Sequence, residues 1–280
     1  HIETARIADL YLPIKNGCNV AFLNAFANCL VNDGLYDKEF VAEHTNGFDE
    51  WWETIKNYTP ESVQDITGVE PALIHQAAEM YATAKPSAII GWGMGVCQQK
   101  QNLKTVHTIA SIACVAGQIG KPNSGLAPVR GQNNVQGSCD MGMWPSLLPG
   151  YQKVENPEAR AKFEKAWGLP EGKLPAEPGF QLTDLPHGVK EGKIKAFYNF
   201  GEDPLQTEPA DMKETLENLE LLISQDIFMT QTTALADVVF PGTSWGEHDG
   251  VFSASDRTFQ RFTAAVPPKG ECKHDWQIFS

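Results

Sequence analysis

One polar stretch, residues 129–142, holds the side chains best suited to binding a small ligand. Arg130 offers a planar guanidinium fork that matches a carboxylate or a phosphate. Amides that both donate and accept follow closely: Gln132, Asn133, Asn134 and Gln136. Interspersed glycines allow a ligand to approach the backbone. A solvated surface loop could share this composition, but so many amides beside one arginine favour a ligand-binding loop.

Two further candidates lie where a predicted strand meets a turn. Residues 87–92 are apolar and bounded by proline and glycine, which is typical of a buried strand. They continue into the glycine-rich loop 91–98, ahead of a helix predicted at 104–116, and ligands of open α/β sheets bind at such strand ends. Near the N-terminus, a strand at 7–14, a turn at 15–19 and a helix at 20–32 would present backbone N–H groups to an anion. A plain connection between elements is the simpler explanation of that second pattern.

Three more predicted strands, 194–200, 219–224 and 236–241, each end in glycine or polar residues. Parallel strands in series place their carboxyl ends on one edge of the sheet. Acidic side chains there can accept hydrogen bonds from a base or a ribose. A single aspartate at a strand end usually caps a helix, whereas three such ends in series predict a nucleotide-binding edge.

Composition excludes several function classes. The 280 residues carry a net charge of −13, which argues against a general nucleic-acid or anionic-membrane surface. No apolar run reaches the length of a membrane span. The six cysteines form no CxxC pair, so we expect no zinc or iron–sulfur site built from the cysteines of this chain. The absence of an initial Met and the abrupt last residues suggest a piece of a longer polypeptide, and free cysteines favour a cytoplasmic location.

Taken together, the segments 130–137, 201–204, 225–228 and 236–248 resemble the catalytic subunit of molybdopterin-dependent formate dehydrogenases. The similarity runs along essentially the whole chain. It implies an α/β fold of two Rossmann-like parallel-sheet domains around a bis-dinucleotide cofactor, part of the molybdopterin oxidoreductase fold. The expected limits are 1–132 and 133–244 for two partial dinucleotide-binding domains. Residues 245–280 form a hairpin segment leading to a C-terminal part that lies outside this chain.

The resemblance also implies site residues. Arg130 matches the arginine that orients the formate carboxylate, so it is the catalytic candidate. The remaining matches are to the cofactor: Asn16, Gly17 and Asn19 in a turn that addresses a guanine, Met94 and Gln98 in the glycine-rich loop, Gln132 beside the pterin, and Asp203, Thr207, Gln225, Asp226 and Asp275 against the dinucleotides. Gly242 stands where relatives carry serine, so only a backbone contact is expected there.

The implied cofactor is molybdenum or tungsten bound by two molybdopterin guanine dinucleotides. The metal's selenocysteine or cysteine ligand and a 4Fe–4S cluster are expected outside this chain, so the isolated chain is not expected to be active. Formate and carbon dioxide are the implied substrate and product. Electron transfer would involve iron–sulfur subunits or NAD-, ferredoxin- or hydrogenase-linked partners.

Three alternatives stay open. Another molybdopterin reaction, such as nitrate reduction, would use the same cofactor on a different substrate. A metal-free scaffold relative would have no need of an arginine that orients an anion. A plain dinucleotide-binding module would not explain the run of amide side chains at 132–136.

Overall fold

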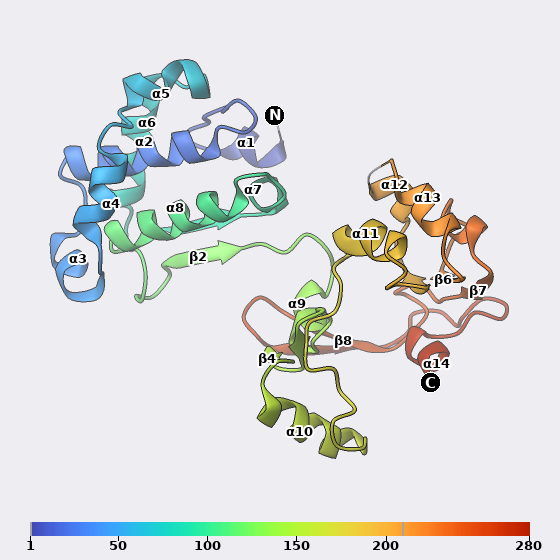
Figure 1. The fold of residues 1–280 in the computed structure, drawn as a ribbon. Helices are drawn as coiled ribbons and strands as arrows, with labels where there is room; N and C mark the ends of the chain where they lie inside the picture. Colours follow the sequence, from blue (N-terminus) through green and yellow to red (C-terminus); the bar gives the residue numbers. More distant parts are fainter. Residues whose placement is uncertain (1, 209) are drawn as a thin grey trace. The chain divides into compact units, whose positions relative to one another are not determined.

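The computed structural model describes residues 2–208 and 210–280, and the chain divides into two compact units, His1–Gly131 and Gln132–Ser280 (Figure 1). The first unit is mostly helical around one small parallel sheet. Its elements are α1 (Glu3–Ile7), α2 (Asn19–Asn32), α3 (Lys38–His44), α4 (Phe48–Ile55), α5 (Pro60–Thr67), α6 (Pro71–Thr83), β1 (Ile89–Trp92), α7 (Met94–Cys97), α8 (Asn102–Val115) and β2 (Gly125–Pro128).

Helix α2 is the centre of the first unit. Its small side chains Ala25, Ala27 and Cys29 are fully buried, as is Leu30, and α5, α6 and α8 all pack against it. The buried Asn28 amide donates to the Lys56 carbonyl at 3.0 Å, which satisfies a carbonyl at the end of α4. Asn32 Nδ2 donates to Asn28 Oδ1 at 2.7 Å, so the asparagines on this face of α2 are held by hydrogen bonds.

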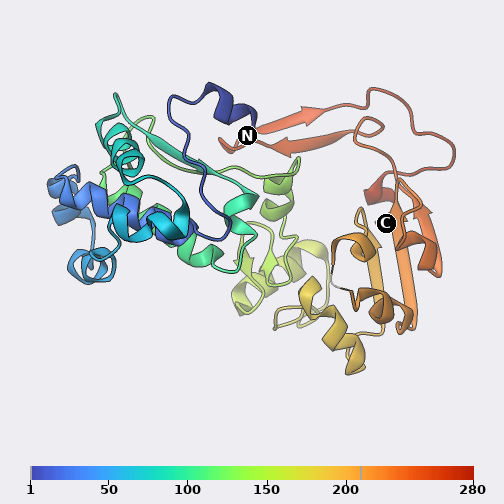
Figure 2. The same ribbon diagram turned by 90° about the horizontal axis from the view of Figure 1, so that it is seen from above.

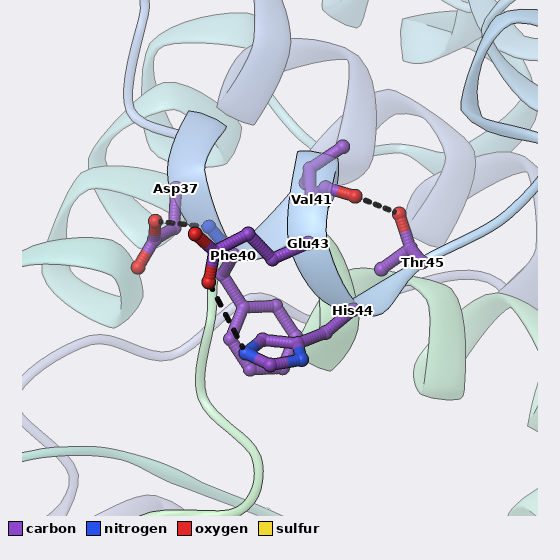
Figure 3. A network of polar contacts seen from close by, with 6 residues as sticks. All are labelled: Asp37, Phe40, Val41, Glu43, His44 and Thr45. Carbon is purple, nitrogen blue, oxygen red and sulfur yellow. Dashed lines mark hydrogen bonds and ion pairs between the residues drawn. The ribbon is translucent and has the colours of Figure 1, made fainter.

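Helix starts follow the local sequence closely. Asp37 caps α3 by accepting from Phe40 N at 3.0 Å, and Thr45 Oγ1 donates back to the Val41 carbonyl at 2.6 Å (Figure 3). Thr59 caps α5, with proline at the first helical position, and both residue types are favoured at these places. Each side chain satisfies a backbone group that the helix end would otherwise leave unpaired.

The strand predicted at 7–14 is wrong. The chain forms α1 at Glu3–Ile7 and then runs without regular structure to residue 15. Pro13 has no backbone N–H to give to a sheet. Leu12 and Ile14 pack instead against the helical core, and Lys15 N donates to the Thr67 carbonyl at 2.9 Å. Tertiary packing therefore outweighs the local strand preference.

The second unit contains a three-stranded parallel sheet, short helices and an antiparallel hairpin. Its elements are α9 (Val135–Asp140), β3 (Leu147–Leu148), β4 (Gln152–Lys153), α10 (Pro157–Trp167), α11 (Leu185–Lys190), β5 (Ala196–Phe200), α12 (Pro204–Thr207), α13 (Met212–Glu217), β6 (Leu221–Asp226), β7 (Val238–Pro241), β8 (Gly250–Ser253), β9 (Phe259–Phe262) and α14 (Asp275–Phe279), with 3-10 turns at Leu182–Asp184 and Thr233–Leu235. The order β5–β6–β7 follows the sequence, and both pairings are parallel. Leu185, Met212, Leu216 and Leu222 form the core beneath this sheet.

The hairpin β8–β9 is the extended ribbon drawn in orange-red in Figure 2, and it confirms the antiparallel pair predicted after residue 245. Gly250 pairs with Phe262, and a Cβ on Gly250 would lie 2.4 Å from that ring. Phe262 in turn stacks on Phe252, with ring centroids 4.6 Å apart. Glycine at this position therefore lets the aromatic ring lie across the neighbouring strand.

Within the described ranges, no helix has both the length and the apolar character needed to cross a membrane.

Candidate functional site

The carboxyl ends of β5, β6 and β7 meet at one edge of the second unit. Phe200 pairs with Gln225, and Asp226 pairs with Pro241, so the residues that follow each strand are neighbours. A pocket of about 480 Å³ lies at this edge. Seven of the residues expected from the sequence line it: Gln132, Asp203, Thr207, Gln225, Asp226, Gly242 and Asp275.

Asp203 is held in place by Thr232, which lies in the turn before β7. Its Oδ1 accepts from Thr232 N at 3.0 Å and from Thr232 Oγ1 at 2.6 Å. Burial raises the pKa of Asp203, but these hydrogen bonds outweigh burial and bring its pKa below the ordinary value. Asp203 is therefore an ionised acceptor, and its second carboxylate oxygen is not engaged by Thr232.

Gln225 is fixed on both sides. Its side chain is buried, and its Oε1 accepts from Tyr198 Oη at 2.7 Å while its Nε2 donates to Asp275 Oδ1 at 2.7 Å. Burial, and then the charge of Asp275, raise the pKa of Tyr198, which keeps the phenol protonated as a donor. The amide orientation therefore follows from the hydrogen-bond network, and the chain Tyr198–Gln225–Asp275 positions a carboxylate at the pocket.

Gly242 brings backbone close to this network. Gly242 pairs with Lys273 in an isolated parallel bridge, which carries the chain on to Asp275. A Cβ on Gly242 would lie 3.3 Å from Asp275 Oδ1, closer than ordinary side-chain contacts. Glycine here leaves room for the carboxylate, and any contact by residue 242 would come from its backbone.

The charge of the pocket is one-sided. Four carboxylates line it, and no Lys, Arg or His is among the described residues that do so: Glu202, Asp203, Asp226 and Asp275 are the acids. Exposed Phe228 and Phe200 add aromatic surface. Such a lining suits a ligand rich in N–H and O–H donors, such as a flat guanine base with its ribose. The pocket carboxylates accept hydrogen bonds from those donors, and the aromatic rings can stack on the base. The lining does not suit a phosphate.

The first unit presents a second strand edge with different chemistry. β1 and β2 are parallel, and Val129 N donates to the Trp92 carbonyl at 2.7 Å, so the residues after both strands are neighbours. Arg130 follows β2 and is exposed. Met94 lies beside the same chain segment, because a Cβ on Gly131 would come within 3.4 Å of its Cγ. This edge carries a cation where the other carries acids.

The other residues expected in the first unit lie around α7 and the start of α2. Asn19 Nδ2 donates to Gln99 Oε1 at 2.8 Å, which ties the start of α2 to the segment after α7. Gln98 ends α7, and its N–H donates to the Met94 carbonyl at 2.8 Å. Asn16 and Gly17 form the turn before α2. The glycine-rich segment is thus not a pure loop, since it contains a short helix.

Sequence reasoning missed several residues that shape these edges. Tyr198, Thr232 and Gln99 each hold an expected residue in place, and Glu202 and Thr230 line the pocket. Glu202 could have been found, because it lies two residues after the end of a predicted strand. Thr232 gives no such signal, since it lies 29 residues from the aspartate that it holds.

Comparison with known proteins adds a family to this geometry. The family model described as molybdopterin oxidoreductase matches residues 2–280. Formate dehydrogenase H of Escherichia coli is 54% identical over 281 residues, covering 100% of this chain and 39% of the relative. The F420-dependent formate dehydrogenase subunit alpha of Methanocaldococcus jannaschii is 42% identical, covering 98% of this chain and 40% of the relative.

Among solved structures, acetylene hydratase from Pelobacter acetylenicus matches with a TM-score of 0.74 and 23% identity, covering 99% of this chain and 41% of that one. At this identity the match shows a shared fold only. The chain spans about two-fifths of the length of each of these three proteins.

Proposed function

Because this chain belongs to the molybdopterin oxidoreductase family, we propose that it forms the part of a formate dehydrogenase catalytic subunit that holds the cofactor and orients formate. Relatives named formate dehydrogenase, at 54% and 42% identity over nearly the whole chain, support the activity. The proposed cofactor binding is supported above all by the carboxylate-lined pocket at the β5–β6–β7 edge. Its described lining residues include no cation.

The residues of this pocket fit one end of a pterin guanine dinucleotide. Asp203, Asp226 and Asp275 offer acceptors to the ring N–H groups and the exocyclic amine of a guanine, or to the hydroxyls of a ribose. Gln225 holds Asp275 in position through its 2.7 Å hydrogen bond. The finer proposal is molybdenum or tungsten bound by two such dinucleotides, with the metal ligand and a 4Fe–4S cluster supplied from outside this chain. Electrons would then pass to a partner subunit.

Arg130 is the residue that we propose for formate. A carboxylate of one carbon has only its two oxygens to hold, and a guanidinium can engage both. A guanidinium is positively charged, so it attracts and aligns the formate anion. The metal–pterin group, when bound, supplies the two-electron oxidation. The protein then contributes orientation and charge.

The test replaces Arg130 by lysine in the complete enzyme. Lysine keeps the charge and removes the fork, so we expect the KM for formate to rise by about tenfold or more with cofactor content unchanged. Arg6→Lys, on the exposed helix α1, is the matched control and should leave KM unchanged. A wild-type KM in Arg130→Lys would reject the role of Arg130 and leave the pocket assignment standing.

A further inference from the structure

Helices α2 and α6 bring three different metal-ligating side chains together in the first unit. Cys29 and Asp33 are one helical turn apart, so they share a face of α2, and His75 reaches them from α6. One ligand atom from each residue lies within 4.8 Å of the other two. His75 Nδ1 is 2.6 Å from Asp33 Oδ2. None of the three residues belongs to either strand edge.

We propose that Cys29, Asp33 and His75 bind a zinc ion. A thiolate, an imidazole nitrogen and a carboxylate oxygen are the ligands that zinc takes in proteins, and three of them leave a fourth position for water. Calcium and magnesium prefer sets made of oxygen alone. The sulfur and nitrogen donors therefore select a borderline-soft transition metal, and zinc is the common one that needs no redox chemistry.

The burial of the three groups matches a site that a cation can enter from solvent. Cys29 is fully buried within the helical core and forms the inner wall. The side chains of Asp33 and His75 are 35% and 41% exposed and form the outer side. Zinc ligands at their usual bond lengths lie about 3.3–3.8 Å from one another, so the Asp33 and His75 side chains would rotate apart from their present 2.6 Å to admit the ion beside the thiol.

A simple ion pair between Asp33 and His75 accounts for two of the three groups, but it gives the buried sulfur no part. The spacing of the cysteines gives no sign of these three ligands, because only one of them is a cysteine and the histidine lies 46 residues further along the chain.

The experiment measures zinc in the complete, tag-free protein after equilibration with zinc and dialysis. Elemental analysis gives the stoichiometry, and X-ray absorption at the zinc edge reports the ligands whatever other metals are present. We expect one zinc per chain with one sulfur neighbour at about 2.3 Å. His75→Gln lies on the surface and should fold, and it should weaken zinc binding by more than about a hundredfold, as should Cys29→Ser.

Cys114→Ser is the matched control, because Cys114 is a partly buried cysteine of the same unit and belongs to no such cluster among the residues that the structure describes. It should keep the zinc and the sulfur neighbour. Wild-type protein without zinc would overturn the proposal. So would zinc without a sulfur neighbour, or zinc retained in full by His75→Gln. None of these results bears on the proposed formate site.

Discussion

The two parallel-strand edges share a topology and differ in charge. After β1 and β2 the chain places Arg130, followed by Gly131 close to Met94, whereas the edge after β5, β6 and β7 has four carboxylates around a pocket. The first edge suits a small anion, and the second suits a ligand that donates hydrogen bonds. Strand order thus sets where a ligand can bind, and the residues directly after each strand decide which ligand it is.

The largest expected effect comes from removing an acid that the fold itself uses. Asp203→Ala would leave two donors of the fully buried Thr232 without their partner, so we expect the free energy of unfolding to fall by about 2–4 kcal/mol. Pterin content should fall with it, and thermal unfolding with elemental and pterin analysis measures both. Asp203→Asn keeps a hydrogen-bond acceptor, so its free energy of unfolding should fall by less than that of Asp203→Ala. Equal stability of wild type and Asp203→Ala would refute the structural role.

The same carboxylate predicts a pH dependence. Hydrogen bonds hold the folded-state pKa of Asp203 below its ordinary value. Its stabilisation is therefore complete above the unfolded-state pKa and is lost as the pH falls through the lower, folded-state pKa. The stability difference between wild type and Asp203→Asn should thus shrink in acid, as urea unfolding between neutral and acidic pH can measure. A constant difference would mean that charge at Asp203 contributes nothing.

Tyr198→Phe is expected to have a smaller effect on the same edge. It removes the donor to Gln225 Oε1 and leaves a buried acceptor unpaired, at a cost of about 1–2 kcal/mol. The Gln225 amide also becomes free to turn away from Asp275, so guanosine binding should weaken. Tyr36→Phe, whose ring stacks on Phe48 in the first unit, is the control for losing a phenol hydroxyl. Unaltered guanosine binding in Tyr198→Phe would show that the network does not set the pocket.

A charge reversal would test the difference between the edges most directly. Glu202 is exposed at the pocket, and Glu202→Lys adds a cation to a lining dominated by acids. We expect cofactor-free protein to favour GMP over guanosine by about threefold to tenfold more than wild type does, and added salt should remove the gain. Glu271→Lys, also exposed but outside the pocket, should leave the ratio unchanged.

The smallest effect is expected at the first edge. Asn19→Ala removes the 2.8 Å hydrogen bond to Gln99, at a cost of about 0.5–1.5 kcal/mol. Amide hydrogen exchange should rise in residues 95–101 and stay unchanged at the second edge. Faster exchange at both edges would mean that Asn19 has a wider role than joining two neighbouring segments.

Much of the fold follows from local sequence. The three strands of the parallel sheet in the second unit are predictable, because each depends on side chains within a few residues. The strand expected at 7–14 fails because Pro13 cannot donate and the helical core takes Leu12 and Ile14. Arg130 and the carboxylates after the strands could be named in advance, since strand ends are marked by turn residues.

The sequence by itself determined most of the charge at each edge, because Arg130, Asp203 and Asp226 lie at or just after strand ends, whereas Asp275 reaches the pocket only through the fold. Only the tertiary structure decided which distant side chains hold those residues. Asp275 meets Gln225 across 50 residues, Thr232 meets Asp203 across 29, and His75 meets Asp33 across 42. Periodicity and turn chemistry report on neighbours along the chain. Packing against a shared core sets the longer-range pairs, and no local pattern contains that information.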